Sequence, residues 1–268
     1  GAASNELGVA GGPLSVLVIS ILAAELGKLV SKETKIDILV TPFVTIFSGC
    51  MLAAWWAPGI GKAASSVGKL IMWATDLQPF LMGIIVSVLV GMALTLPISS
   101  AAICAALGLT GLAGGAAVAG CCAQMVGFAV MSFRENKWGG LISQGLGTSM
   151  LQMGNIVHNP RIWIPPTLAS AITGPIATCI FGLEMNGAAV SSGMGTCGLV
   201  GQIGVYTGWI SPSKEAIANG AAAIMPGVWE WMGLLLISFV LPAVLSVVFC
   251  EGLRKIGWIR ENDLKLNS

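Results

Sequence analysis

Apolar segments long enough to cross a lipid bilayer recur along this 268-residue chain. A helical crossing takes about 20 mostly apolar residues, because the hydrocarbon core holds no water to satisfy the backbone. Charged residues make up 9% of the chain, against roughly a quarter in an ordinary soluble domain. The sequence therefore predicts an all-α integral membrane protein, a multi-span helical bundle, rather than a very apolar soluble protein.

The expected helices are apolar runs bounded by polar residues, glycine or proline. The second run ends at Trp55-Trp56, before Pro58-Gly59, which is typical of an interfacial aromatic belt. After it, Lys62 and Lys69 are set apart from the apolar side chains, which predicts an amphipathic helix in the interface. We expect spans at residues 13–30, 36–57, 79–97, 112–133, 161–183 and 226–250, a short helix at 100–109 and the interfacial helix at 61–76.

The centre of the chain is predicted to be densely packed and irregular. Pro165-Pro166 and Gly174-Pro175 are expected to break the 161–183 run twice. Broken helices at membrane depth occur where the backbone is packed in protein or lines a cavity. Residues 141–155 are too polar and too short for a span, and residues 99–133 are rich in alanine and glycine, which lets backbones approach closely.

Charge position is more informative than the net charge of +1, which gives no reason to expect a nucleic-acid partner. Three basic clusters lie just beyond apolar runs, as the positive-inside rule expects: residues 28–35, 134–137 and 254–265. Counting the membrane crossings does not put all three clusters on one side. We expect one transmembrane domain at residues 1–250 and a charged cytoplasmic tail at 251–268. The chain opens on Gly1 without a signal pattern, which is compatible with missing N-terminal membrane segments.

The seven cysteines and the single histidine form no pattern typical of a disulfide framework or a metal site. No CxxC spacing occurs, and most cysteines lie in apolar runs, where they serve as small hydrophobic residues. A Walker-type phosphate loop, a GxSxG elbow and an HExxH helix are also missing. We therefore expect no catalytic residues of a hydrolase or ATPase, no metal and no cofactor.

Two Gly-rich segments in the second half of the chain resemble each other. Residues 145–149 read Gly-Leu-Gly-Thr-Ser before Gln152, and residues 193–197 read Gly-Met-Gly-Thr-Cys before Gln202. The 161–183 run separates them. If that run crosses the membrane once, the segments insert from opposite faces as re-entrant hairpins, at residues 143–155 and 184–204. They can then meet near the midplane, where transporters built from repeats hold their solutes.

The residue types in these segments favour binding of a small polar solute. Glycine provides tight reversals and accessible backbone groups, while threonine and glutamine add neutral hydrogen bonding. Such groups suit a hydroxylated or amide-bearing solute better than an inorganic ion. The alternative is that the glycines only let helices pack closely, as in GxxxG contacts. The paired glutamines and the adjacent prolines favour binding, because close packing needs neither.

Polar residues beside the segments have two interpretations each. His158 is either an interfacial hydrogen-bonding residue or a group for solute binding or proton exchange. Glu184 either accepts hydrogen bonds from a sugar-like solute or marks a loop, and the first is favoured because it is the acid nearest the hairpins. Glu230 and Glu25 are weaker candidates. The expected binding residues are Gln144, Gly147, Thr148, Gln152, Asn155, His158, Glu184, Asn186, Gly195, Thr196 and Gln202.

Three runs resemble the second EIIC-type family of the phosphotransferase system, which includes perfringolysin-regulator-like proteins. They are residues 143–150 (SQGLGTSM), 159–166 (NPRIWIPP) and 193–202 (GMGTCGLVGQ), and the last is the most specific. The resemblance runs through nearly the whole chain. It implies an EIIC-like permease fold of helices and re-entrant hairpins, usually a homodimer in the bacterial cell membrane, that binds a sugar for uptake coupled to phosphorylation.

The resemblance also implies roles and partners. Members of the wider EIIC group place a histidine and a glutamate near the sugar, and His158 and Glu184 are the matching residue types, although their local motifs differ. No EIIB domain with its phosphocysteine motif and no EIIA domain is attached here, so coupling would need separate partner proteins. Two functions are weighed: a permease that translocates the solute, and a membrane-embedded sensor or regulator that binds it without transport. A purely structural subunit is a third alternative, but it leaves the polar hairpins unexplained.

Overall fold

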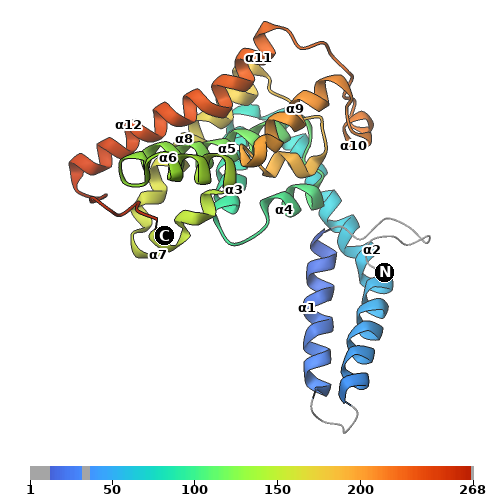
Figure 1. Cartoon of the computed structure of the whole chain (residues 1–268). Coiled ribbons are helices and arrows are strands. Elements are labelled where there is room, and N and C mark those ends of the chain that lie inside the picture. The colour runs from blue at the N-terminus through green and yellow to red at the C-terminus, as the bar shows by residue number, and fades with distance from the viewer. Residues whose placement is uncertain (1–12, 32–36, 267–268) are drawn as a thin grey trace. The chain divides into compact units, whose positions relative to one another are not determined.

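The computed structural model describes residues 13–31 and 37–266, and the elements within these ranges are all helical (Figure 1). The predicted all-α class is confirmed. Contacts divide the chain into two compact units, Gly1–Lys69 with Ala105–Leu107 and Leu70–Cys104 with Gly108–Ser268. The residues predicted to bind a solute all lie in the second unit.

The first unit is built on α1 (Pro13–Val30) and the N-terminal part of α2 (Asp37–Leu77). The two helices pack through buried Ile19, Ala53 and Ala57. α1 has the predicted bounds, whereas the predicted division of α2 into two helices was wrong. The 41-residue helix continues through position 58, because a proline removes only one backbone hydrogen bond and the neighbouring turns keep theirs.

The second unit is organised around α5 (Gly111–Met131). Of its apolar stretch, 94% is buried inside the protein, so α5 meets other helices rather than lipid. It packs against α3 (Pro79–Thr95), α8 (Ile164–Pro175) and α12 (Leu241–Ile256). A Cβ at Gly120 of α5 would collide with the backbone of α3, so the expected close approach of backbones is confirmed.

Four helical stretches within the described ranges are long and apolar enough to cross a membrane. They are Leu39–Ala57, Gly111–Met131, Pro160–Phe181 and Val228–Ile256. The predicted span at 79–97 is the shorter apolar helix α3, which has 17 residues. These lengths and compositions are those of a multi-pass membrane protein.

The predicted double break of the 161–183 run was wrong. η3 (Pro160–Trp163), α8 and η4 (Ile176–Phe181) follow one another as a continuous helical path. Pro165-Pro166 lies in the first turn of α8, where a missing backbone N–H breaks no helical bond. Pro175 is followed by the π-helical η4, whose wider turn absorbs the irregularity.

Short helical turns connect the long helices. α4 (Ser100–Leu107) confirms the predicted short helix, and the chain turns before α5 at Gly108 and Gly111, with φ of 65° and 63°. The last span reaches Ile256, six residues beyond the predicted end at 250. The other elements are α6 (Phe133–Ile142), η1 (Ser143–Gly147), η2 (Ser149–Gln152), α7 (Met153–His158), η5 (Ala189–Gly193), η6 (Cys197–Leu199), α9 (Val200–Ile210), α10 (Lys214–Ala218), α11 (Val228–Leu235) and η7 (Leu236–Val240).

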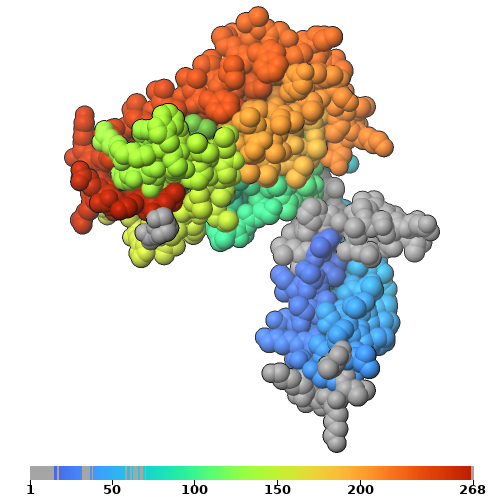
Figure 2. Space-filling model, viewed as in Figure 1, coloured from blue at the N-terminus to red at the C-terminus, as the bar shows by residue number. Residues whose placement is uncertain are grey.

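The C-terminal segment, residues 257–266, packs back onto the second unit. Leu264 and Ile259 are 0% and 2% exposed and share a hydrophobic cluster with Phe128 of α5 and Ile162 of η3. In Figure 2 the deep-red C-terminal residues lie beside the yellow-green surface of α6 and α7. This contact brings the C-terminal segment next to the first Gly-rich segment.

Candidate functional site

The two Gly-rich segments meet in the second unit. Thr196 of the second segment donates a hydrogen bond from Oγ1 to the backbone carbonyl of Gly145 in the first, at 2.6 Å. Gly195 has a φ of 53°, and a Cβ on it would lie 2.7 Å from the Cβ of Cys121 on α5. Thr196 is fully buried, so the junction is a packed contact. The two segments therefore contact each other as predicted, whereas their position near the membrane midplane and their insertion as re-entrant hairpins stay predictions.

Close packing accounts for Gly193 and Gly204 of the second segment. Added Cβ atoms at Gly193 and Gly204 would collide with Ser100 and Ser191, and Ser100 Oγ donates to the Gly193 carbonyl at 2.7 Å. The first segment differs, because a Cβ on the exposed Gly147 would meet no atom within 4 Å. The packing alternative therefore explains the second segment and leaves Gly147 unexplained.

Gln202 on α9 carries an unsatisfied oxygen beside this junction. Its Nε2 donates to Cys122 Sγ at 3.2 Å, while its buried Oε1 accepts no hydrogen bond within the described part of the chain. Buried acceptors usually have a partner. Gln202 is not among the lining residues of either cavity described below, so this oxygen is a buried acceptor without a partner among the described residues.

A cavity of about 280 Å³ lies beside the residues that precede the second segment. Glu184, Asn186, Trp209 and Glu230 are among its lining residues, and we name it the Glu184 cavity. Asn186 Nδ2 donates to Glu184 Oε2 at 2.7 Å, which orients the carboxylate. The volume lies near the lower end of the roughly 300–1,000 Å³ typical of ligand sites, so the cavity suits a small solute.

Backbone pairing holds the wall of the Glu184 cavity in place. Gly111 and Met185 exchange two backbone hydrogen bonds of 3.1 and 3.0 Å in an isolated antiparallel bridge. On the other side, Glu230 Oε2 accepts a hydrogen bond from the Gly227 N–H at 2.8 Å at the start of α11. Both carboxylates therefore have a fixed neighbour while their residues line the cavity.

Three predicted binding residues of the first segment bind one another and the C-terminal segment. Gln152 Nε2 donates to Gln144 Oε1 at 2.9 Å and to the Leu264 carbonyl at 3.0 Å. Asn155 Nδ2 donates to Gln152 Oε1 at 2.7 Å and to the Lys265 carbonyl at 3.0 Å. Gln144 and Gln152 are fully buried, so a solute would reach them only after displacing the C-terminal segment.

Thr148 and His158 have separate surroundings. Thr148 Oγ1 accepts a hydrogen bond from the Met150 N–H at 3.2 Å and caps η2. The exposed His158 ends α7 and lines a second cavity of about 280 Å³. This second cavity shares no lining residue with the Glu184 cavity, so the structure does not bring His158 and Glu184 together in one site.

Gln124 is a buried polar residue that the sequence analysis overlooked. Its Oε1 accepts hydrogen bonds from Thr95 Oγ1 at 3.2 Å and Trp163 Nε1 at 3.1 Å, and its Nε2 donates to Thr167 Oγ1 at 3.3 Å. Thr95 Oγ1 is in turn 3.0 Å from Ser149 Oγ in the first segment. The sequence signal for Gln124 is its side-chain amide within a 21-residue apolar helix. A polar group is costly at such a position unless it has a partner.

Cys104 on α4 shows how the buried thiols behave. Burial raises the pKa of the Cys104 thiol to about 11, and the side chain of Ser192 opposes that rise. The thiol is therefore protonated at neutral pH and acts as a small apolar residue, as the sequence predicted for the cysteines in apolar runs.

Comparison with known proteins identifies the family. The family model described as "Phosphotransferase system, EIIC" matches residues 2–266. No curated protein and no solved structure shows a significant match to the chain. Since the match covers nearly the whole sequence, the chain belongs to the EIIC family of the phosphotransferase system, whose members are membrane components of sugar transport.

Proposed function

We propose that this chain is a permease that binds a small polar solute, a sugar, in the Glu184 cavity and passes it across the bacterial cell membrane. The observation that carries the proposal is the lining of this cavity by Glu184, Asn186, Glu230 and Trp209. Ionised carboxylates accept hydrogen bonds from hydroxyl groups, and an amide both donates and accepts them. The indole of Trp209 adds an apolar face, so the set suits a hydroxylated solute with an apolar carbon skeleton.

The two Gly-rich segments are proposed to be the re-entrant hairpins beside this cavity. The bond from Thr196 to Gly145 and the short turns η1, η2, η5 and η6 support this, because they place irregular backbone against the buried α5. Irregular backbone is tolerated at membrane depth only when it is buried in protein or lines a cavity. Gln202 does not line the Glu184 cavity, but its Oε1 has no partner among the described residues and is proposed to accept a hydrogen bond from the solute as it passes between the segments.

Coupling and assembly are proposed by analogy with the family. Phosphate is proposed to come from separate EIIA and EIIB proteins, and the permease is proposed to be a homodimer. A cytoplasmic C-terminus is supported by Arg254, Lys255, Arg260 and Lys265 just beyond the apolar part of the last span. The 251–268 tail and the single transmembrane domain at 1–250 are part of the same proposal.

A membrane-embedded sensor is the second candidate. It is favoured by the C-terminal segment, whose Leu264 and Lys265 carbonyls accept hydrogen bonds from Gln152 and Asn155 of the first Gly-rich region. Through these bonds, a change in that region would alter the docking of residues at the surface. A sensor would bind the solute without flux, so binding and transport have to be measured separately.

Ligand binding tests the site. Purified protein is titrated with a panel of sugars and nucleosides while its thermal unfolding is followed, since a ligand that binds only the folded state raises the midpoint. We expect one solute class to stabilise the wild type, and Glu184→Ala and Gln202→Ala to abolish that shift. Glu215→Ala, on the exposed surface of α10, is the control and should keep it. Unchanged binding in both site variants would refute the proposed site.

A further inference from the structure

A second cavity lies between the turn after α7 and the C-terminal segment. It has a volume of about 280 Å³ and is lined by His158, Asn159, Arg161, Trp258, Arg260 and Asp263, together with Gly257. These are almost all polar or charged residues, in contrast to the apolar helices on which the cavity sits. The proposed sugar site does not use this cavity.

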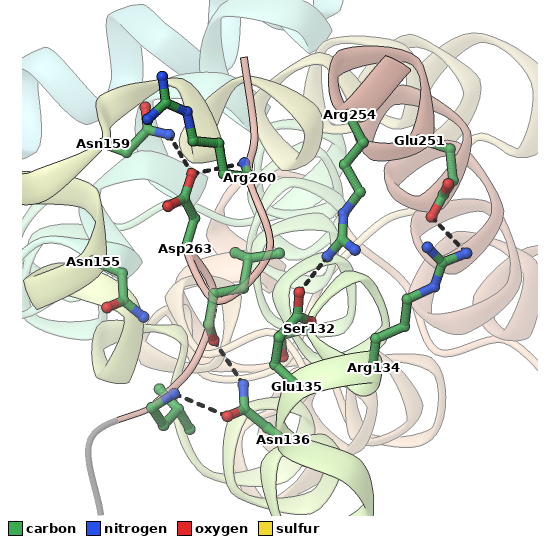
Figure 3. Close-up of polar contacts among 12 residues, drawn as sticks. Ser132, Arg134, Glu135, Asn136, Asn155, Asn159, Glu251, Arg254, Arg260 and Asp263 are labelled. Atoms are coloured by element: carbon green, nitrogen blue, oxygen red, sulfur yellow. Dashed lines mark hydrogen bonds and ion pairs between the residues drawn. The ribbon is translucent and has the colours of Figure 1, made fainter. Parts of the chain in front are cut away.

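The charge of the cavity favours an anion. Arg161 and Arg260 are exposed, and neither forms an ion pair with a residue of the described chain. The one acid, Asp263, is already engaged, because its Oδ2 accepts hydrogen bonds from Asn159 Nδ2 at 2.7 Å and from the Arg260 backbone N–H at 2.8 Å. Figure 3 shows Asp263 between these two partners. The cavity lining therefore contains two arginines and one acid, whose Oδ2 already accepts two hydrogen bonds.

The Arg161 guanidinium is held in a defined position. Its central carbon lies 5.1 Å from the ring centre of Trp258, which is within the range of a cation–π contact. A guanidinium that contacts a ring with one face can still donate hydrogen bonds from the N–H groups at its edge. These N–H groups form a planar fork that matches two oxygens of a phosphate. The stacking therefore pre-orients a phosphate-binding group.

Asn159 joins the two walls of the cavity. Its Oδ1 accepts a hydrogen bond from the Arg161 backbone N–H at 3.2 Å, and its Nδ2 donates to the Trp258 carbonyl at 3.0 Å as well as to Asp263. One amide thus ties the turn that carries Arg161 to the segment that carries Arg260. The cavity is a built feature rather than a gap between loose chain ends.

We propose that this cavity binds a phosphate group through Arg161 and Arg260, with His158 as an additional hydrogen-bonding side chain. The phosphate group could belong to either of two ligands with the same chemistry: a phosphate monoester in solution, or the headgroup of an anionic phospholipid. Positive charge, a pre-oriented guanidinium and a polar lining are the features that recognise either one.

The test uses the full-length protein and two phosphate sources. Inorganic phosphate and a hexose phosphate are titrated by calorimetry at constant ionic strength, with chloride as the reference anion. In parallel, the protein is placed in nanodiscs of phosphatidylglycerol or phosphatidylcholine, and retained lipid is measured by native mass spectrometry. The variants are Arg161→Gln, Arg260→Gln and Arg161→Lys, and Arg134→Gln is the matched control, since this exposed arginine lies outside the cavity.

Saturable binding of the soluble phosphates identifies a solution ligand, and selective retention of phosphatidylglycerol identifies a lipid headgroup. Either result supports the site if Arg161→Gln and Arg260→Gln weaken binding by roughly tenfold or more, as loss of a charge-assisted hydrogen bond predicts. Arg161→Lys should weaken it less, because the charge remains and only the fork is lost. Absence of both kinds of binding in folded wild-type protein, or equal loss in Arg134→Gln, would overturn the proposal.

Discussion

The hydroxyl of Thr196 donates a 2.6 Å hydrogen bond to the carbonyl of Gly145, 51 residues away in sequence, and so joins the two Gly-rich segments. Both segments also contact α5, with Gly195 seated against Cys121. A change in one segment is therefore felt by the other. This bond joins the two segments that are proposed to form the hairpins.

Thr196→Val should weaken the junction while conserving its shape. The variant removes the hydroxyl donor to the Gly145 carbonyl in a partly buried contact, at a cost of about 0.6–2 kcal/mol. Thr196→Ser keeps the hydroxyl and should retain most of the stability. Thermal unfolding in detergent measures the difference, and equal midpoints for the valine and serine variants would show that the bond contributes nothing.

Glu135→Ala should destabilise the protein far more than Glu251→Ala. Arg254 and Glu135 form a 2.6 Å pair with side chains only 13% and 7% exposed, whereas Arg134 and Glu251 pair at 3.1 Å with 68% and 38% exposure (Figure 3). Removing Glu135 strands a nearly buried guanidinium, which costs about 3–5 kcal/mol. The exposed pair contributes at most about 1 kcal/mol.

Unfolding of the two single variants is compared under the same conditions. Glu135→Ala combined with Arg254→Ala should recover part of the lost stability, because no unpaired charge remains. If Glu135→Ala and Glu251→Ala were equally stable, the buried pair would contribute no more to the free energy of unfolding than the exposed pair.

Asn136→Ala should loosen the C-terminal segment. The Asn136 side chain donates to the Leu264 carbonyl at 2.7 Å and accepts from the Leu266 N–H at 2.8 Å, so both bonds are lost together (Figure 3). We expect a loss of about 1–3 kcal/mol and faster proteolytic cleavage within residues 257–266. Lys265→Ala alters an exposed side chain of the same segment and should leave cleavage unchanged. Equal cleavage rates in the two variants would contradict this role.

Thiol labelling should distinguish Cys104 from Cys197. Maleimide reacts with the thiolate, and burial raises the pKa of Cys104 to about 11, so little thiolate is present at pH 7 to 8. In folded single-cysteine variants, labelling of Cys104 should stay slow and rise with pH towards that value. The half-exposed Cys197 is the accessible comparison. Labelling of Cys104 at the rate of Cys197 at pH 7 would contradict its burial.

The helices were largely predictable from the sequence, because apolar runs and their glycine or proline boundaries are local signals. α1, α4 and α5 lie where these signals placed them. The prolines misled at two places, since Pro165-Pro166 occupies a first helical turn and α2 continues past position 58. A sequence pattern shows a proline but not its place within the helix.

The meeting of the two Gly-rich segments was predictable from their repeat, but the partners of their amides were not. Gln152 and Asn155 bind carbonyls 112 and 110 residues away, and no local pattern predicts such pairs. His158 and Glu184 were paired through residue type alone, and they line different cavities. Trp209 and Glu230 come to the Glu184 cavity through the tertiary fold.

Uptake by proteoliposomes tests the central claim most directly. The solute found in the binding panel is radiolabelled, and its accumulation is measured for wild type, Glu184→Ala and the control Glu215→Ala. We predict accumulation by wild type and Glu215→Ala, and a loss of roughly tenfold or more in Glu184→Ala, the scale expected for losing a charged hydrogen-bond acceptor. Binding without accumulation would make the chain a sensor, and unchanged uptake by Glu184→Ala would contradict the proposed site.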